Sequence, residues 1–121
     1  EEAYCVQGKA KKLISQILRI SPLQHETSNL QATAIGQQFS IHHDFSYHQV
    51  EFLFEEGPRT WTVLTYLTHP QETHGGSTTF PYLNIDVKPK KGDSIIWPNA
   101  YQSTLIKDYR LYHAGTMVTK G

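Results

Sequence analysis

The sequence predicts a mainly β domain with one N-terminal helix, on two observations. Over the first twenty residues, apolar side chains recur at intervals of three and four, which is typical of one face of an amphipathic helix. The remainder consists of short segments rich in β-branched and aromatic residues, separated by turns. One helix followed by many short strands predicts a β-sandwich or β-barrel with a helical buttress.

The helix is expected from Ala3 to Ile20. Ser21-Pro22 ends it, because a proline disfavours the α region in the residue before it. We expect this helix to pack against a sheet, and docking of a partner is the alternative use of its apolar face. That face is formed by Val6, Ala10, Leu13, Ile14, Ile17 and Leu18.

Short strands are expected along the rest of the chain. A long polar loop, Thr68 to Thr79, interrupts them, with Gly75-Gly76 in its middle. This loop and the region from Ser46 to Glu51 are candidate lids, because long polar loops beside a site often close over substrate. The strands are expected at Leu30 to Ile35, Phe39 to Asp44, Val50 to Phe54, Arg59 to Leu67, Ile85 to Lys88, Ser94 to Trp97 and Leu111 to Thr119.

Composition limits the classes of function. At 121 residues the chain is one domain, 1–121, large enough for a single core. Lys+Arg and Asp+Glu balance at 11 each, so nothing indicates capture of nucleic acid or of an anionic membrane. No apolar run approaches the roughly 20 residues that a membrane span needs. The single Cys5 excludes an internal disulfide and a Cys-rich zinc site.

A His-x-Asp pair and a distant histidine are the candidate metal ligands. His42 and Asp44 stand two apart in an expected strand, so both point to one side, while His43 points away. His113 can join them if a barrel brings its strand alongside. Two imidazoles and one carboxylate describe the facial triad of non-heme Fe(II) oxygenases. Chance is the alternative, since the chain has seven histidines, and such triads also bind zinc.

Five blocks of sequence follow one another in a known order. They are Leu30-Gln31 with Gly36-Gln37 and His42-x-Asp44; Arg59-x-x-Thr62-x-Leu64-x-Tyr66-Leu67; Gly75-Gly76-Ser77-Thr78-Thr79-Phe80-Pro81; Val87-Lys88-Pro89-Lys90-Lys91-Gly92-Asp93; and His113-Ala114-Gly115. Together they resemble the 2-oxoglutarate- and Fe(II)-dependent oxygenases, and among these the collagen-type prolyl 4-hydroxylases. The resemblance extends from roughly Leu30 to the C-terminus.

The resemblance implies a double-stranded β-helix, or jelly roll, and makes His42, Asp44 and His113 the Fe(II) ligands. The free positions would take bidentate 2-oxoglutarate and O2. The implied reaction hydroxylates proline in a proline-rich peptide or protein and releases succinate and CO2, with ascorbate as a further cofactor. An oxygenase acting on another amino acid or a small molecule, and a catalytically silent jelly-roll binding domain, are the alternatives. The implied compartment is the endoplasmic reticulum lumen for animal or plant types and the cytoplasm for bacterial or viral ones.

Departures from the family pattern concern the cosubstrate. The family's Lys for the far carboxylate of 2-oxoglutarate stands ten positions after the distal His, here position 123, so we expect the last strand to be missing from this chain. Lys120 is three positions too early and would point to the other face of a strand. Thr33 stands where many members carry a cosubstrate-binding Tyr. Thr78 matches a Thr near the cosubstrate pocket, and the alternative is a loop Thr bonded to backbone.

Four residues are candidates for contacts with the substrate. The resemblance points to Arg59 as a cation that contacts the peptide, and the alternative is a turn residue paired with a nearby glutamate. Phe39 replaces a frequent Tyr three residues before the first iron ligand and keeps the ring. Trp97, with Tyr66, is a candidate to line a groove for a proline-rich strand, because aromatic rings pack well on a polyproline II helix. A core position is the alternative for both.

Overall fold

The computed structural model describes residues 2–45, 57–69 and 73–121, with side chains from Gln7 onward. The chain forms two compact units, Glu1–Gln31 and Ala32–Gly121. The predicted strand from Val50 to Phe54 and the candidate lid from Ser46 to Glu51 lie outside the described residues. Within the described part of the chain, no helix combines the length and apolarity that crossing a bilayer requires.

The first unit consists of helix α1 (Glu2–Leu18) and the short 3-10 helix η1 (Pro22–Gln24). The predicted helix is confirmed, but it ends before Ile20. Arg19 adopts the left-handed conformation, with φ 55°, and the Ile20 N–H donates to the Ser15 carbonyl at 3.1 Å. These are two features of a Schellman cap, which closes the helix before the proline is reached. Packing of α1 against a sheet stays a prediction.

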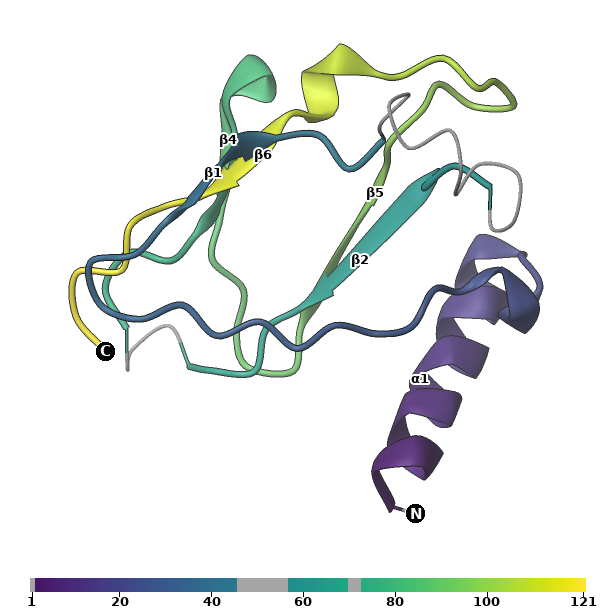
Figure 1. The fold of residues 1–121 in the computed structure, drawn as a ribbon, viewed down its shortest axis with the longest axis horizontal. Coiled ribbons are helices and arrows are strands. Elements are labelled where there is room, and N and C mark those ends of the chain that lie inside the picture. Colours follow the sequence, from purple (N-terminus) through teal and green to yellow (C-terminus); the bar gives the residue numbers. More distant parts are fainter. Residues whose placement is uncertain (1, 46–56, 70–72) are drawn as a thin grey trace. The chain divides into compact units, whose positions relative to one another are not determined.

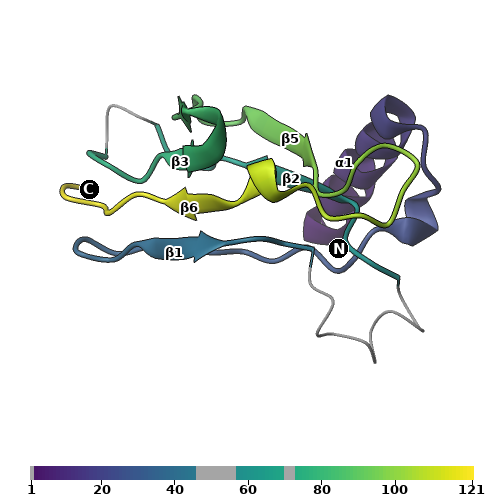
Figure 2. The ribbon, with the colours of Figure 1, turned by 90° about the horizontal axis from the view of Figure 1, so that it is seen from above.

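The second unit is built from two antiparallel sheets, which confirms the mainly β prediction (Figure 1). One sheet has the strand order β1-β6-β3-β4, and the other pairs β2 with β5. Figure 2 shows β1, β6 and β3 side by side although they are far apart in the sequence. The strands are β1 (Phe39–His42), β2 (Trp61–Thr65), β3 (Thr78–Phe80), β4 (Ile85–Val87), β5 (Ser94–Pro98) and β6 (His113–Gly115), with 3-10 helices η2 (Pro81–Leu83) and η3 (Tyr109–Leu111).

The predicted strand from Leu30 to Ile35 is wrong, because residues 30–34 carry no regular structure. Ile35 is 61 % exposed, so these apolar residues do not form one side of a buried strand. Backbone pairing begins only afterwards. The Gly36 N–H donates to the Val118 carbonyl at 2.7 Å, and the Val118 N–H donates to the Gln37 carbonyl at 3.0 Å.

Further boundaries differ from the prediction, and strand β2 covers only Trp61–Thr65 of the expected Arg59 to Leu67. The last predicted strand, Leu111 to Thr119, is β6 alone, because Leu111 closes helix η3. The Asp108 side chain caps that helix by accepting from the Arg110 N–H at 3.1 Å. The polar loop ends at Ser77 rather than Thr79, since β3 begins with Thr78. Strand β1 stops at His42, two residues before the predicted end.

A small core joins the two sheets. It contains Phe80 from β3, Trp97 from β5 and Leu111 from η3, with Leu64 and Ile95 packed against them. The Phe80 and Trp97 rings meet edge to face at 5.2 Å between centroids. Because both rings also contact the His113 imidazole, at 5.6 Å and 4.8 Å, the core sets the position of that histidine.

Candidate metal centre

Strand register brings the two predicted histidine ligands together. His42 on β1 is directly opposite His113 on β6, and their ring centroids are 4.3 Å apart. Directly opposite residues of an antiparallel pair project from the same face of the sheet. His113 is 6 % exposed and is enclosed by the core rings, whereas His42 is only partly buried.

Asp44 completes the group just beyond the end of β1. Its Oδ1 lies 3.4 Å from His42 Nε2 and 3.6 Å from His113 Nε2. The three ligand atoms all lie within 4.8 Å of one another, and no second such group occurs among the described residues. Donor atoms that bind one ion at about 2.0–2.2 Å are themselves roughly 3 Å apart, so the spacing suits a single metal ion.

Backbone carbonyls fix the tautomers of both histidines. His42 Nδ1 lies 2.8 Å from the Ser40 carbonyl oxygen, and His113 Nδ1 lies 3.0 Å from that of Leu111. A carbonyl oxygen can only accept, so each Nδ1 carries a proton, and in the neutral form of each ring the lone pair is on Nε2. This is the outer-shell arrangement typical of metal-binding histidines.

The state of His113 also suits metal binding. Burial lowers the pKa of His113, while the hydrogen bond to the Leu111 carbonyl and the Asp44 carboxylate act in the opposite direction. A lowered pKa keeps the imidazole neutral, which is the form that binds a metal. Two imidazoles and the adjacent carboxylate therefore fit the donor set of a facial triad.

His43 behaves differently from its neighbours. The strand pattern predicts that His43 points away from the ligands; the residue is partly buried and hydrogen-bonded at both nitrogens. Its Nε2–H donates to the Asp108 carbonyl at 2.9 Å, and its Nδ1 accepts from the Phe45 N–H at 3.0 Å. Burial lowers the pKa of His43. It therefore ties the segment between the two ligands to the loop before η3, a role that the sequence did not indicate.

Thr78 and Tyr66 form a polar pair between the two sheets. Thr78 is 5 % exposed, and its hydroxyl is hydrogen-bonded to the Tyr66 hydroxyl. Burial raises the pKa of Tyr66, so the phenol stays protonated and able to donate. Thr78 pairs with Gly115, two residues from His113 along β6, which is roughly 6–7 Å of strand.

The structure does not bring the other predicted site residues into one group. Thr33 is exposed in the irregular segment before Gly36, and Arg59 is exposed just before β2. Phe39 is 44 % exposed, and its ring lies 4.3 Å from the His42 ring. Trp97 is 4 % exposed, so it takes the core position that was its alternative. The functional roles of these four residues stay predictions.

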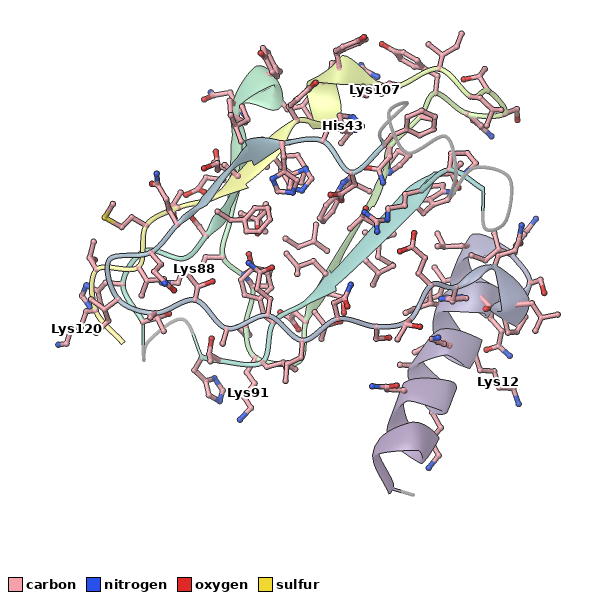
Figure 3. The ribbon with its side chains drawn as sticks, in the orientation of Figure 1. Lys12, His43, Lys88, Lys91, Lys107 and Lys120 are labelled. Atoms are coloured by element: carbon pink, nitrogen blue, oxygen red, sulfur yellow. The ribbon has the colours of Figure 1, made fainter. Side chains whose placement is uncertain are left out.

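A tyrosine cavity lies beside helices η2 and η3, and no sequence pattern predicts it. Its volume is about 240 Å³, and it is lined by Tyr82, Tyr109, Arg110 and Tyr112. Tyr112 precedes His113, and its ring lies 5.0 Å from the His43 ring. Lys107 lies 5.4 Å above the Tyr112 ring, and Figure 3 shows Lys107 and His43 at the same end of this unit.

The chain belongs to the 2OG-Fe(II) oxygenase superfamily, whose family model matches residues 28–121. Among curated relatives, it is 32 % identical over 117 residues to prolyl 4-hydroxylase subunit alpha-2 of Gallus gallus, covering 96 % of this chain and 21 % of that protein. It is 41 % identical over 91 residues to a putative prolyl 4-hydroxylase of Acanthamoeba polyphaga mimivirus, covering 71 % of this chain and 36 % of that protein.

A solved structure supports the same relationship. The viral collagen prolyl hydroxylase of Paramecium Bursaria Chlorella virus-1, in its 2OG complex, superposes with a TM-score of 0.60 at 33 % identity. The match covers 74 % of this chain and 49 % of that chain. It confirms the jelly-roll prediction, and family membership implies Fe(II) and 2-oxoglutarate as cofactors. The chain spans only about a fifth to a third of the two curated relatives, at 21 % and 36 %.

Proposed function

We propose that this chain is the catalytic domain of an Fe(II)- and 2-oxoglutarate-dependent dioxygenase that hydroxylates peptidyl proline as a prolyl 4-hydroxylase, releasing succinate and CO2. The convergence of His42, Asp44 and His113 between the two sheets is the observation that carries the proposal. Similarity to prolyl 4-hydroxylases from an animal and a virus supports proline as the target. Ascorbate enters the proposal from the family resemblance alone.

The residues of the chain have distinct tasks in this proposal. His42 Nε2, His113 Nε2 and Asp44 Oδ1 would hold Fe(II) on one face. With 2-oxoglutarate and O2, the iron supplies the oxidation that replaces a C–H bond by C–OH. The Tyr66 and Thr78 hydroxyls share one hydrogen bond, which leaves one hydroxyl proton to donate to the far carboxylate of 2-oxoglutarate. Hydroxyl donors alone leave a dianion without charge compensation, so a cation is also required.

We assign peptide contacts to the exposed aromatic surface rather than to Trp97, which is buried. Tyr82 is 68 % exposed and Tyr109 is 63 % exposed, and both line the tyrosine cavity. Tyrosine rings pack well against the rigid polyproline II helix that proline-rich segments adopt. Residues flanking the target proline would contact this cavity, with Phe39 and Arg59 as further contacts.

Succinate formation tests the proposal. The protein is loaded with Fe(II) under anaerobic conditions and given 2-oxoglutarate, ascorbate and O2, with and without a proline-rich peptide. We expect succinate only with the peptide, together with a mass gain of one oxygen atom per modified proline. Succinate that does not depend on the peptide would indicate another substrate. Absence of succinate despite bound metal would indicate a silent binding domain, and either result would overturn the proposal.

A further inference from the structure

A chain of hydrogen bonds runs from the second sheet to the candidate metal centre. Thr62, the second residue of β2, donates from Oγ1 to Asp44 Oδ2 at 2.6 Å. Asn99, directly after β5, donates from Nδ2 to Thr62 Oγ1 at 2.8 Å. Asp44 follows β1, which belongs to the four-stranded sheet. The two hydrogen bonds therefore connect its carboxylate to the sheet formed by β2 and β5.

Asn99 is the fixed end of this series of hydrogen bonds. Asn99 is fully buried, at 0 % exposure. Its backbone is held on both sides, because its N–H donates to the Thr60 carbonyl at 2.8 Å and its carbonyl accepts from the Asp108 N–H at 3.0 Å. The amide nitrogen that contacts Thr62 is therefore fixed in position by the backbone.

The direction of the hydrogen bonds follows from the chemistry of the groups. An ionised carboxylate can only accept, so the single hydroxyl proton of Thr62 must point to Asp44. The Thr62 oxygen then has only lone pairs for Asn99, which must present its NH2 group rather than its carbonyl oxygen. The hydroxyl therefore has no rotational freedom, and Oδ2 of Asp44 is occupied.

This arrangement gives the two carboxylate oxygens of Asp44 different partners. Oδ2 is held by Thr62, while Oδ1 faces both Nε2 atoms at 3.4 Å and 3.6 Å. A carboxylate can bind a cation through one oxygen or through both. If both oxygens bound, the second would take a coordination position that a facial triad leaves open for its cosubstrate.

We propose that Thr62 and Asn99 are positioning residues that keep Asp44 a ligand through Oδ1 alone. The inference rests on the proposed metal centre but not on the identity of the substrate. Outer-shell partners of metal ligands typically contribute about 10–100-fold to metal affinity. Thr62 acts directly on the carboxylate, and Asn99 acts through Thr62.

A matched pair of substitutions at Thr62 separates the hydroxyl from the methyl group. Thr62→Val keeps the shape and removes the hydroxyl, and Thr62→Ser keeps the hydroxyl and removes the methyl. Co(II) serves as the probe, because its visible absorption bands report coordination number and its affinity is measured by titration without turnover. Thermal unfolding of the metal-free variants checks the fold, and Thr62→Ala is measured instead if the valine variant does not fold.

We expect Thr62→Val to bind Co(II) about 10–100-fold more weakly and to change its visible spectrum. We expect Thr62→Ser to keep the wild-type spectrum and an affinity near that of the wild type. A wild-type spectrum and affinity in Thr62→Val would overturn the inference, as would equal losses in the two variants. If the wild type binds Co(II) with these properties but forms no succinate, the proposed function fails while the positioning role stands.

Discussion

Tyr66→Phe tests whether the polar pair between the sheets binds the cosubstrate. The substitution removes one hydroxyl and leaves the ring in place. Thr78, at 5 % exposure, then loses the hydroxyl to which it is bonded. If the Tyr66 hydroxyl donates to the far carboxylate, one charge-assisted hydrogen bond is also lost, worth about 1.5–3 kcal/mol. That loss corresponds to a roughly 10- to 150-fold increase in the Kd for 2-oxoglutarate.

The assay is calorimetric titration of 2-oxoglutarate into protein loaded with Mn(II), which binds such sites without turnover. Tyr82→Phe is the matched control, because Tyr82 is 68 % exposed and its side chain lies at the tyrosine cavity. We expect the control to keep the wild-type Kd. If Tyr66→Phe and Tyr82→Phe both bind 2-oxoglutarate as the wild type does, the polar pair is not part of the cosubstrate site.

Three further predictions concern the fold and the peptide surface. Gly75→Ala should lower the Tm more than Gly36→Ala. Both glycines have a positive φ, at 74° and 81°. However, a Cβ at Gly75 would lie 1.8 Å from a backbone carbonyl oxygen, while one at Gly36 would meet nothing within 4 Å. Equal losses of Tm in the two variants would show that the destabilisation comes only from the left-handed backbone conformation, at about 1–2 kcal/mol. The Arg110 guanidinium holds the pKa of Asp108 below its ordinary value, so that stabilisation is present above about pH 4 and is lost as the pH falls through the folded-state pKa. Urea unfolding of Asp108→Asn, which keeps a capping acceptor, should therefore depend less on pH below about pH 4 than that of the wild type, and an unchanged pH dependence would contradict this. Tyr109→Ala should raise the KM for a proline-rich peptide roughly 2- to 12-fold, from about 0.5–1.5 kcal/mol per aromatic contact, and leave the Kd for 2-oxoglutarate unchanged. A change in the Kd instead would place Tyr109 at the cosubstrate.

The elements that the sequence predicted well are those with a local signal. The three- and four-residue spacing predicted α1, and runs of β-branched and aromatic residues predicted β2 and β5. The segment from Leu30 to Ile35 carries similar residues but pairs with no strand among the described residues, and a local pattern says nothing about pairing. Its neighbour Gly36 pairs instead with Val118, 82 residues further along the chain (118 − 36).

The candidate site likewise has a part with a local sequence signal and a part without one. The spacing of His42 and Asp44 indicated a shared face, but His113 could be added only through the family resemblance, because its place opposite His42 depends on strand register. Asp44 lies beyond the end of β1, so its orientation depends on Thr62 rather than on strand alternation. No sequence pattern indicates that hydrogen bond, since Thr62 belongs to the other sheet.

Fe(II) binding under anaerobic conditions tests the metal centre most directly. Titration calorimetry compares the wild type with His113→Ala and with His74→Ala, in which an exposed histidine is removed as the control. We predict one ion per chain for the wild type and the control. His113→Ala should weaken Fe(II) binding by more than the roughly 10–100-fold typical of outer-shell changes. Equally tight binding of one Fe(II) by His113→Ala would contradict the assignment of a metal centre to His42, Asp44 and His113.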